Sequence, residues 1–95
     1  MADVIAEIAA ERRRQIEVEG WDTKHDDDFN DSGELAAAAG CYALASCDLM
    51  DWMRICALDL WPWKRDWWKP RGRRRDLIRA AALIVAEIER LDRAG

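Results

Sequence analysis

Apolar side chains recur with a helical period near the N-terminus of the chain. One stripe, at a period of 3.6 residues, is formed by Val4, Ile5, Ile8 and Ile16. Asp3 stands where a side chain can cap the first turn, and Gly20 stands where a helix ends. This pattern predicts a helix over residues 3–19. The next stretch, GWDTKHDDDFN at 20–30, has turn-forming and acidic residues without periodicity and predicts a loop.

A second helix is predicted over residues 32–47. Asp31 followed by Glu34 resembles a capping box, with Asp in place of the usual Ser or Thr, at the start of the run that continues as ELAAAAGCYALAS. Alanine and glycine surround the axis of this run, so neighbouring helices can approach closely and the helix is expected to lie centrally. Residues 48–60 either prolong it or form a separate short helix, and we favour the separate helix.

A long final helix is predicted from Arg73 to Arg93. Its apolar positions, spaced 4-3-4-3, predict a seam that faces the rest of a bundle. They are Leu77, Ala81, Ile84, Ile88 and Leu91. The preceding segment, WPWKRDWWKPRG at 61–72, holds both prolines, a glycine and four of the six tryptophans. It excludes a continuous helix and is compatible with an ordered loop.

These elements predict an all-α fold, a small helical bundle of three to four helices with a Trp-rich connecting segment. Residues 1–95 are expected to form one helical domain. A chain of 95 residues builds only a modest core, so extra burial through self-association is expected and a homo-oligomer is predicted. An apolar content of 51% with 36% charged residues fits a folded chain.

Cysteine usage and the N-terminus bear on the compartment. Three cysteines without a C-x-x-C pair suggest neither a disulfide framework nor a zinc knuckle. The N-terminus lacks the basic-then-apolar order of a signal peptide, and no apolar run approaches the ~20 residues that span a bilayer. We therefore expect a cytoplasmic protein without a membrane partner.

Charge is unevenly distributed along the chain. Residues 1–63 carry 5 basic and 14 acidic side chains, whereas residues 64–79 carry 8 basic and 2 acidic ones. Such asymmetry can bring metal-binding carboxylates together with phosphate-binding cations, or it can reflect self-complementarity within an oligomer. The net charge of −4 argues against extended nucleic acid as the ligand.

Several polar residues fall in apolar places. Arg12, Gln15 and Glu19 lie on the same side of the first predicted helix as its apolar stripe, so they need partners or a ligand, unless the helix leaves the core after its second turn. On the second helix, Asp31 is explained as an N-cap, which leaves Glu34 as the candidate functional carboxylate.

Two further acidic groups are candidate cation ligands. Glu89 and Asp92 form an i, i+3 pair that can hold a hard divalent cation such as Mg²⁺, although a frayed last turn with solvated charges explains them equally. The run from His25 to Asp28 could add a metal ligand, but we favour an ordered loop or a solvated acidic patch.

The Trp-rich segment also has two interpretations. Its four tryptophans, which include Trp63 and Trp67, are interleaved with lysine and arginine, so bases could stack on the rings while phosphates pair with the cations. Packing in a core or an oligomer interface is the favoured alternative.

Four segments together resemble a known family. They are ERRRQIEVEGWDTKHDDDF, GELAAAAGCYA, WPWKRDWWKP and RRRDLIRAAALIVAEIERLDR, which cover about four fifths of the chain. They resemble small phage and prophage proteins grouped with the dATP/dGTP pyrophosphohydrolase domain, which are often related to the all-α MazG-like nucleotide pyrophosphohydrolases. The resemblance implies an oligomeric helical bundle in which Mg²⁺-bound carboxylates receive the phosphates of a nucleoside triphosphate.

In MazG-like enzymes an E-x-x-E pair on one helix and an E-x-x-D pair on another hold the metals. By this resemblance Glu89 and Asp92 would supply the second pair, and Glu34 one member of the first. The chain departs from the pattern because Asp31 stands at the preceding position and only Ala, Gly and Cys follow Glu34.

The leading hypothesis is a phage-type nucleotide-handling protein that splits a (deoxy)nucleoside triphosphate into monophosphate and pyrophosphate. Mg²⁺ would be held by Glu34, Glu89 and Asp92, with Glu34 and Glu89 catalytic. The expected nucleotide-binding residues are Arg12, Gln15, Trp63, Trp67, Arg73 and Arg74. The alternative is a non-catalytic phage anti-defence protein that sequesters a signalling nucleotide or binds a host defence protein. A third is a structural or protein-binding module with a Trp-rich interface.

Overall fold

A computed structural model describes residues 3–95 of the chain, and its regular structure is helical throughout that range. The five α-helices are α1 (Val4–Glu17), α2 (Thr23–Phe29), α3 (Glu34–Ala45), α4 (Asp51–Leu60) and α5 (Arg73–Ala94), with a 3-10 turn η1 (Arg65–Trp67) before α5. None of the helices in the described range is both long enough and apolar enough to cross a membrane.

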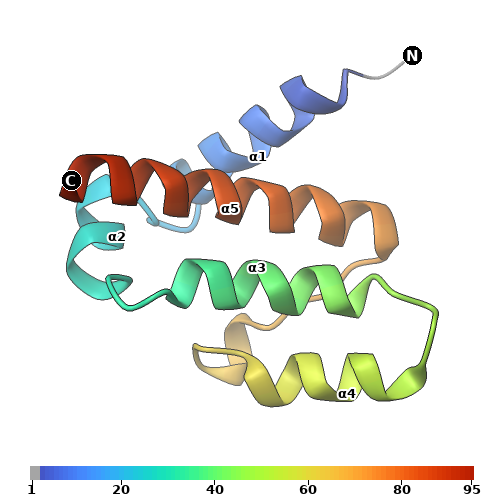
Figure 1. The fold of residues 1–95 in the computed structure, drawn as a ribbon. Helices are drawn as coiled ribbons and strands as arrows, with labels where there is room; N and C mark the ends of the chain where they lie inside the picture. The colour runs from blue at the N-terminus through green and yellow to red at the C-terminus, as the bar shows by residue number, and fades with distance from the viewer. Residues whose placement is uncertain (1–2) are drawn as a thin grey trace.

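Helix α3 is the central element of the fold, as its composition predicts. It packs against α5 on one side and α4 on the other, and Figure 1 shows α5 running in the opposite direction to α3. Helix α1 packs against α5, and the short α2 closes the end where α3 begins and α5 finishes (Figure 1). The all-α class is therefore confirmed, with five helices in place of the expected three to four.

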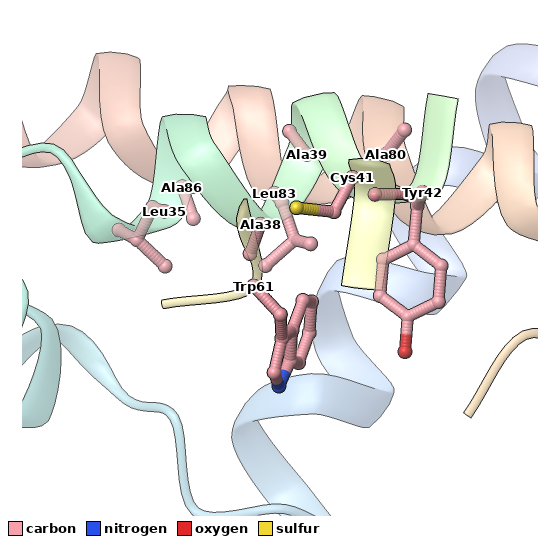
Figure 2. Close-up of a cluster of buried hydrophobic side chains, with 10 residues drawn as sticks. Leu35, Ala38, Ala39, Cys41, Tyr42, Trp61, Ala80, Leu83 and Ala86 are labelled. Atoms are coloured by element: carbon pink, nitrogen blue, oxygen red, sulfur yellow. The ribbon is translucent and has the colours of Figure 1, made fainter. Parts of the chain in front are cut away.

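Small side chains let α3 and α5 approach closely. The buried cluster combines five residues of α3 with three of α5, and Figure 2 shows most of these side chains converging above Trp61. The members are Leu35, Ala38, Ala39, Cys41, Tyr42, Ala57, Trp61, Ala80, Leu83 and Ala86. The Trp-rich segment seals this core, because Trp61 and Trp68 both pack against the ring of Tyr42 at centroid distances of 5.5 and 4.9 Å.

The observed N-caps and boundaries of the helices agree in part with those predicted from the sequence. Asp3 caps α1 through its Oδ1, which accepts the N–H of Ala6 at 3.2 Å, as predicted. The capping box predicted for α3 is wrong, because the N-cap is Gly33 at φ +93° and not Asp31. Glu34 Oε1 instead accepts the N–H of Ser32 at 2.7 Å. Helix α4 is separate from α3, as favoured above.

The loop predicted over residues 20–30 is wrong, because α2 occupies Thr23–Phe29. Its N-cap is Asp22, whose Oδ1 accepts the N–H of His25 at 2.9 Å. With 7 residues and many carboxylates, the segment has no apolar stripe that a periodicity search can detect. Tertiary contacts stabilise it instead.

The seam of α5 was predicted to face the bundle, and in the single chain it faces solvent. Leu77, Ile84, Ile88 and Leu91 are all exposed, whereas the core side of α5 presents Leu83 and small alanines to α3. The apolar stripe of α1 departs in the same way, with Val4 and Ile5 exposed. The prediction that this seam faces the rest of the bundle is therefore wrong for the single chain.

Candidate functional site

The buried face of α1 is polar, which inverts the usual arrangement of a surface helix. Glu11 and Gln15 are each 2% exposed and Arg12 is 7% exposed. Burying such groups costs free energy unless each has a hydrogen-bond or ionic partner. The contacts of these three residues therefore show which of them are used by the fold and which are left for a ligand.

Arg12 is fully engaged within the chain. Its guanidinium donates to Asp26 Oδ2 at 3.1 Å, to Glu89 Oε1 at 3.3 Å and to the carbonyl oxygen of Trp21 at 3.1 Å. The structure thus brings together the predicted residues Arg12 and Glu89, but as an ion pair. Arg12 acts as a cross-link between α1, α2 and α5.

Asp26 is the partner that the sequence interpretation missed. It is 0% exposed, and its Oδ1 accepts the side-chain N–H of Asn30 at 3.2 Å. Asn30 Oδ1 in turn accepts the indole N–H of Trp63 at 3.1 Å, so the network reaches the Trp-rich segment. Burial raises the pKa of Asp26 above its usual range, against the opposing effects of Arg12 and Asn30. The i, i+4 spacing of Asp26 and Asn30 was the one available signal.

An open hollow of about 730 Å³ lies between α1 and the start of α5, and we call it the arginine hollow. Its lining carries five arginines and two glutamates, a clear excess of positive charge. The charged residues are Glu7, Glu11, Arg14, Arg71, Arg73, Arg74 and Arg75. The predicted residues Arg73 and Arg74 both lie here.

Ion pairs hold the arginines in place around this hollow. Glu11 accepts from Arg14 at 2.9 Å and from Arg75 at 2.5 Å, and Glu7 accepts from Arg74 at 2.6 Å. Burial alone would raise the pKa of Glu11, but the hydrogen bonds and charges of Arg14 and Arg75 outweigh it and lower the pKa. Glu11 is therefore a carboxylate at neutral pH.

Helix α5 adds the field of its N-terminus to the arginine hollow. It begins at Arg73 after Gly72, which has φ +123°, and no side chain in the described range caps its first turn. The first N–H groups of a helix carry partial positive charge and bind anions, so they reinforce the arginine side chains that surround them.

A second hollow of about 480 Å³ is walled by aromatic rings, and we call it the tryptophan hollow. Its lining residues are Trp21, His25, Pro62, Trp63, Lys64 and Trp67. Trp21 lies between Trp63 and Trp67, with ring centroids 5.0 and 6.2 Å away. The predicted residues Trp63 and Trp67 are therefore brought together, and Trp21 joins them from outside the Trp-rich segment.

A narrow neck lies between the two hollows. Glu11 and Arg14 line both the neck and the arginine hollow, whereas Trp21 and Trp67 line both the neck and the tryptophan hollow. Within residues 3–95, Gln15 Oε1 and Arg79 Nε are buried in this neck without a hydrogen-bond partner. The neck measures about 10 Å³, which is the size of a single water molecule, so an ordered water is the group that fits beside this acceptor and donor.

The carboxylates predicted to hold Mg²⁺ do not fit that ion as they are arranged here. Glu34 accepts a backbone N–H at its own helix start, and Glu89 pairs with Arg12. Over the described residues no group of three or more His, Cys, Asp or Glu side chains is placed to share a metal ion. The start of α3 and the end of α5 do lie at the same end of the molecule (Figure 1), but we assign no metal-dependent step to them.

Comparisons of the chain with protein-family models, with curated proteins and with solved structures found no match. The resemblance to nucleotide pyrophosphohydrolases therefore stays a prediction, and so does the activity that it implies. The two hollows, one cationic and one aromatic, are the basis for assigning a function.

Proposed function

We propose that this chain binds a nucleotide and holds it chemically unchanged. The phosphates would lie in the arginine hollow and the base in the tryptophan hollow. The observation that carries this proposal is that the cationic arginine hollow and the aromatic tryptophan hollow both share lining residues with the neck, so the two lie near each other on the molecule.

The phosphate end has the chemistry that phosphates need. Guanidinium groups donate in a fork that matches two phosphate oxygens, and such charge-assisted bonds are about twice as strong as neutral ones. Glu7 and Glu11 position Arg74, Arg14 and Arg75 before a ligand arrives, which lowers the entropy lost on binding. Bound phosphate would add contacts to the same arginines.

The base end offers stacking surfaces that do not select one base. Trp67 is 43% exposed, with Lys69 Nζ 5.7 Å from its ring centroid, and Trp21 and Trp63 complete the wall. Stacking of a base on an aromatic ring contributes about 1–3 kcal/mol. Sequestration of a signalling nucleotide fits this arrangement, with the arginine hollow and the tryptophan hollow both contributing to its affinity.

Hydrolysis of a nucleoside triphosphate to monophosphate and pyrophosphate is the second candidate. The shared end of α3 and α5 favours it, because Glu34 begins α3 and Glu89 and Asp92 stand in the last turns of α5 (Figure 1). The engagement of Glu89 with Arg12 argues against it. Binding without turnover is therefore the better-supported function.

A titration with ATP, GTP, dATP and dGTP tests the proposal. Each nucleotide is added with Mg²⁺ and with a chelator, while tryptophan fluorescence and heat are recorded, and the nucleotide is then recovered. We expect quenching, binding without Mg²⁺, weaker binding at high salt and an unchanged nucleotide. Release of pyrophosphate would contradict the proposal and support hydrolysis instead. If no nucleotide binds, the result would favour a protein-binding module.

Single substitutions at each end identify the site. Arg71→Ala in the arginine hollow and Trp67→Leu in the tryptophan hollow should each weaken binding about tenfold, which corresponds to about 1.4 kcal/mol. The matched controls, Arg13→Ala on the exposed side of α1 and Trp52→Leu on α4, should bind as the parent does. Equal losses in the variants and their controls would place the ligand elsewhere.

A further inference from the structure

The side of α5 that faces away from α3 is apolar along most of its length. Leu77, Ile84, Ile88 and Leu91 are each between 49% and 54% exposed, at the 4-3-4-3 spacing completed by Ala81. Scattered exposed apolar residues are ordinary, but a continuous stripe at this spacing is not. A repeat of 3.5 residues is the pattern that another α-helix fits.

The apolar surface continues from α5 onto α1. A shallow hollow of about 400 Å³ between the two helices is lined by Ile5, Ile8, Ile16 and Val85, among others. Ile5 is 74% exposed and Val4 is 48% exposed, so the large apolar side chains at the start of α1 face solvent in the single chain. Val85 links this hollow to the stripe, since it lies one helical turn from both Ala81 and Ile88.

The size of this surface suits a stable dimer. Helix α5 has 22 residues, and with α1 beside it the face is roughly 33 Å long and about 20 Å wide, on the order of 650 Å². A standard interface buries about 800 Å² on each partner. Two such faces would bury about 1,300 Å² in total, which lies at the lower end of the range of about 1,200–2,000 Å² for specific interfaces.

Charges at the two ends of the stripe select a partner of the same sequence. Residues 73–79 hold four arginines and one aspartate, whereas residues 87–92 hold three carboxylates and one arginine. Arg74 and Asp92 are 18 residues apart, which is five helical turns, so they lie on the same side of the stripe. Two copies of α5 crossing in opposite directions would place Arg74 of each near Asp92 of the other.

We infer that the α1–α5 face binds a second copy of this chain, with the two α5 helices running in opposite directions. This inference does not depend on nucleotide binding. It explains why the core side of α1 is polar while its apolar residues face outward, because in the dimer those residues are buried.

Sedimentation and light scattering of the full chain test the inference. We expect a dimer at micromolar concentration, and Ile88→Glu should convert it to a monomer with an unchanged helical circular dichroism spectrum. The matched control is Ile55→Glu, an exposed position on α4 at the opposite side of α3 (Figure 1), which should leave the dimer intact. A monomeric parent, or a dimer that survives Ile88→Glu, would overturn the inference.

Charge reversal tests the orientation. Asp92→Arg should weaken the dimer several-fold, because it places two arginines together at each end of the stripe. Adding Arg74→Asp to the same chain should restore the association. A double variant that associates no better than Asp92→Arg alone would exclude the opposed arrangement.

Discussion

At the scale of single residues, Glu11 shows how this small protein tolerates a polar interior. Its carboxylate is buried, yet it accepts hydrogen bonds from the side chains of Arg14, Gln15 and Arg75. Hydrogen bonds to a charged acceptor contribute more than neutral ones, so the carboxylate is stabilised in its ionised form. Its lowered pKa records that balance.

The stability contribution of Glu11 should depend on pH. Because its pKa in the folded state lies below its ordinary value of 4.5, the unfolded state binds more protons near that pH. The contribution is therefore complete above the ordinary pKa and is lost as pH falls through the lowered one. Glu11→Gln should reduce the free energy of unfolding at pH 7 by about 1–3 kcal/mol.

Urea denaturation at pH 7 and at pH 3 measures this difference. The gap between the free energies of unfolding of the parent and Glu11→Gln should be smaller at pH 3, because below the ordinary pKa of 4.5 the unfolded parent binds a proton that the folded state disfavours. Glu17→Gln, at an exposed position on the same helix, is the control and should change little at either pH. A gap that is equal at both pH values would mean that the charge of Glu11 does not stabilise the fold.

At the scale of elements, the alanine-rich composition of α3 allows its central position, and one glycine forms its N-cap. Gly33 is the N-cap at φ +93°, a backbone conformation that residues with a Cβ rarely adopt. Gly40 lies inside the same helix, and a Cβ added there would meet no atom within 4 Å. The two glycines therefore differ in backbone conformation and not in crowding.

Alanine at these two positions should act in opposite directions. Gly33→Ala should lower the free energy of unfolding by about 1–3 kcal/mol, because it forces a strained backbone. Gly40→Ala should raise it by about 0.5–1 kcal/mol, because alanine is the better helix former and has room. Thermal or denaturant unfolding of both variants measures these changes. A lower free energy of unfolding for Gly40→Ala would contradict the prediction and show that an added methyl group at this position disturbs a contact.

At the scale of the whole molecule, Arg12 joins parts of the chain that are distant in sequence. Glu89 is separated from it by 77 positions, and Asp26 belongs to the short helix that closes the end of the bundle. Removing one partner of a buried ion pair leaves an uncompensated charge, which costs far more than the pair itself contributes. Arg12 should therefore be essential to the assembly of α1, α2 and α5.

Arg12→Met should lower the free energy of unfolding by about 3–5 kcal/mol, since Asp26 would lose its cation in a buried place. Arg65 in η1 is exposed and lies outside the α1–α5 face, so Arg65→Met should stay within about 0.5 kcal/mol of the parent. Urea unfolding followed by circular dichroism compares the two. Equal effects at both positions would show that the contacts of Arg12 are dispensable.

The long helices could be predicted from local signals, because each signal acts within a few turns. Asp3 caps α1, the alanine-rich run forms α3, and the run of residues from Arg73 forms α5 over nearly the predicted range. The short α2 could not, because a seven-residue helix depends on partners such as Arg12 and Trp63, which lie elsewhere in the sequence.

The candidate site divides in the same way. From the sequence, Arg73, Arg74, Trp63 and Trp67 were predicted as candidate binding residues, because arginine pairs with phosphates and tryptophan stacks on bases, while packing was the favoured alternative for the tryptophans. Gln15 was also predicted, but the sequence could not show that Trp21 lies beside Trp63 and Trp67, or that Glu89 pairs with Arg12. Such pairings depend on which helix faces meet.

The sequence by itself determined the helical class, the spacing of the seam on α5 and the clustering of cations and aromatic rings, because these are properties of residues close together in the chain. Only the tertiary structure decided that the seam turns outward and that the polar side of α1 turns inward. A helical period defines a face but not its partner, and the partner depends on packing and charge pairing across the whole molecule.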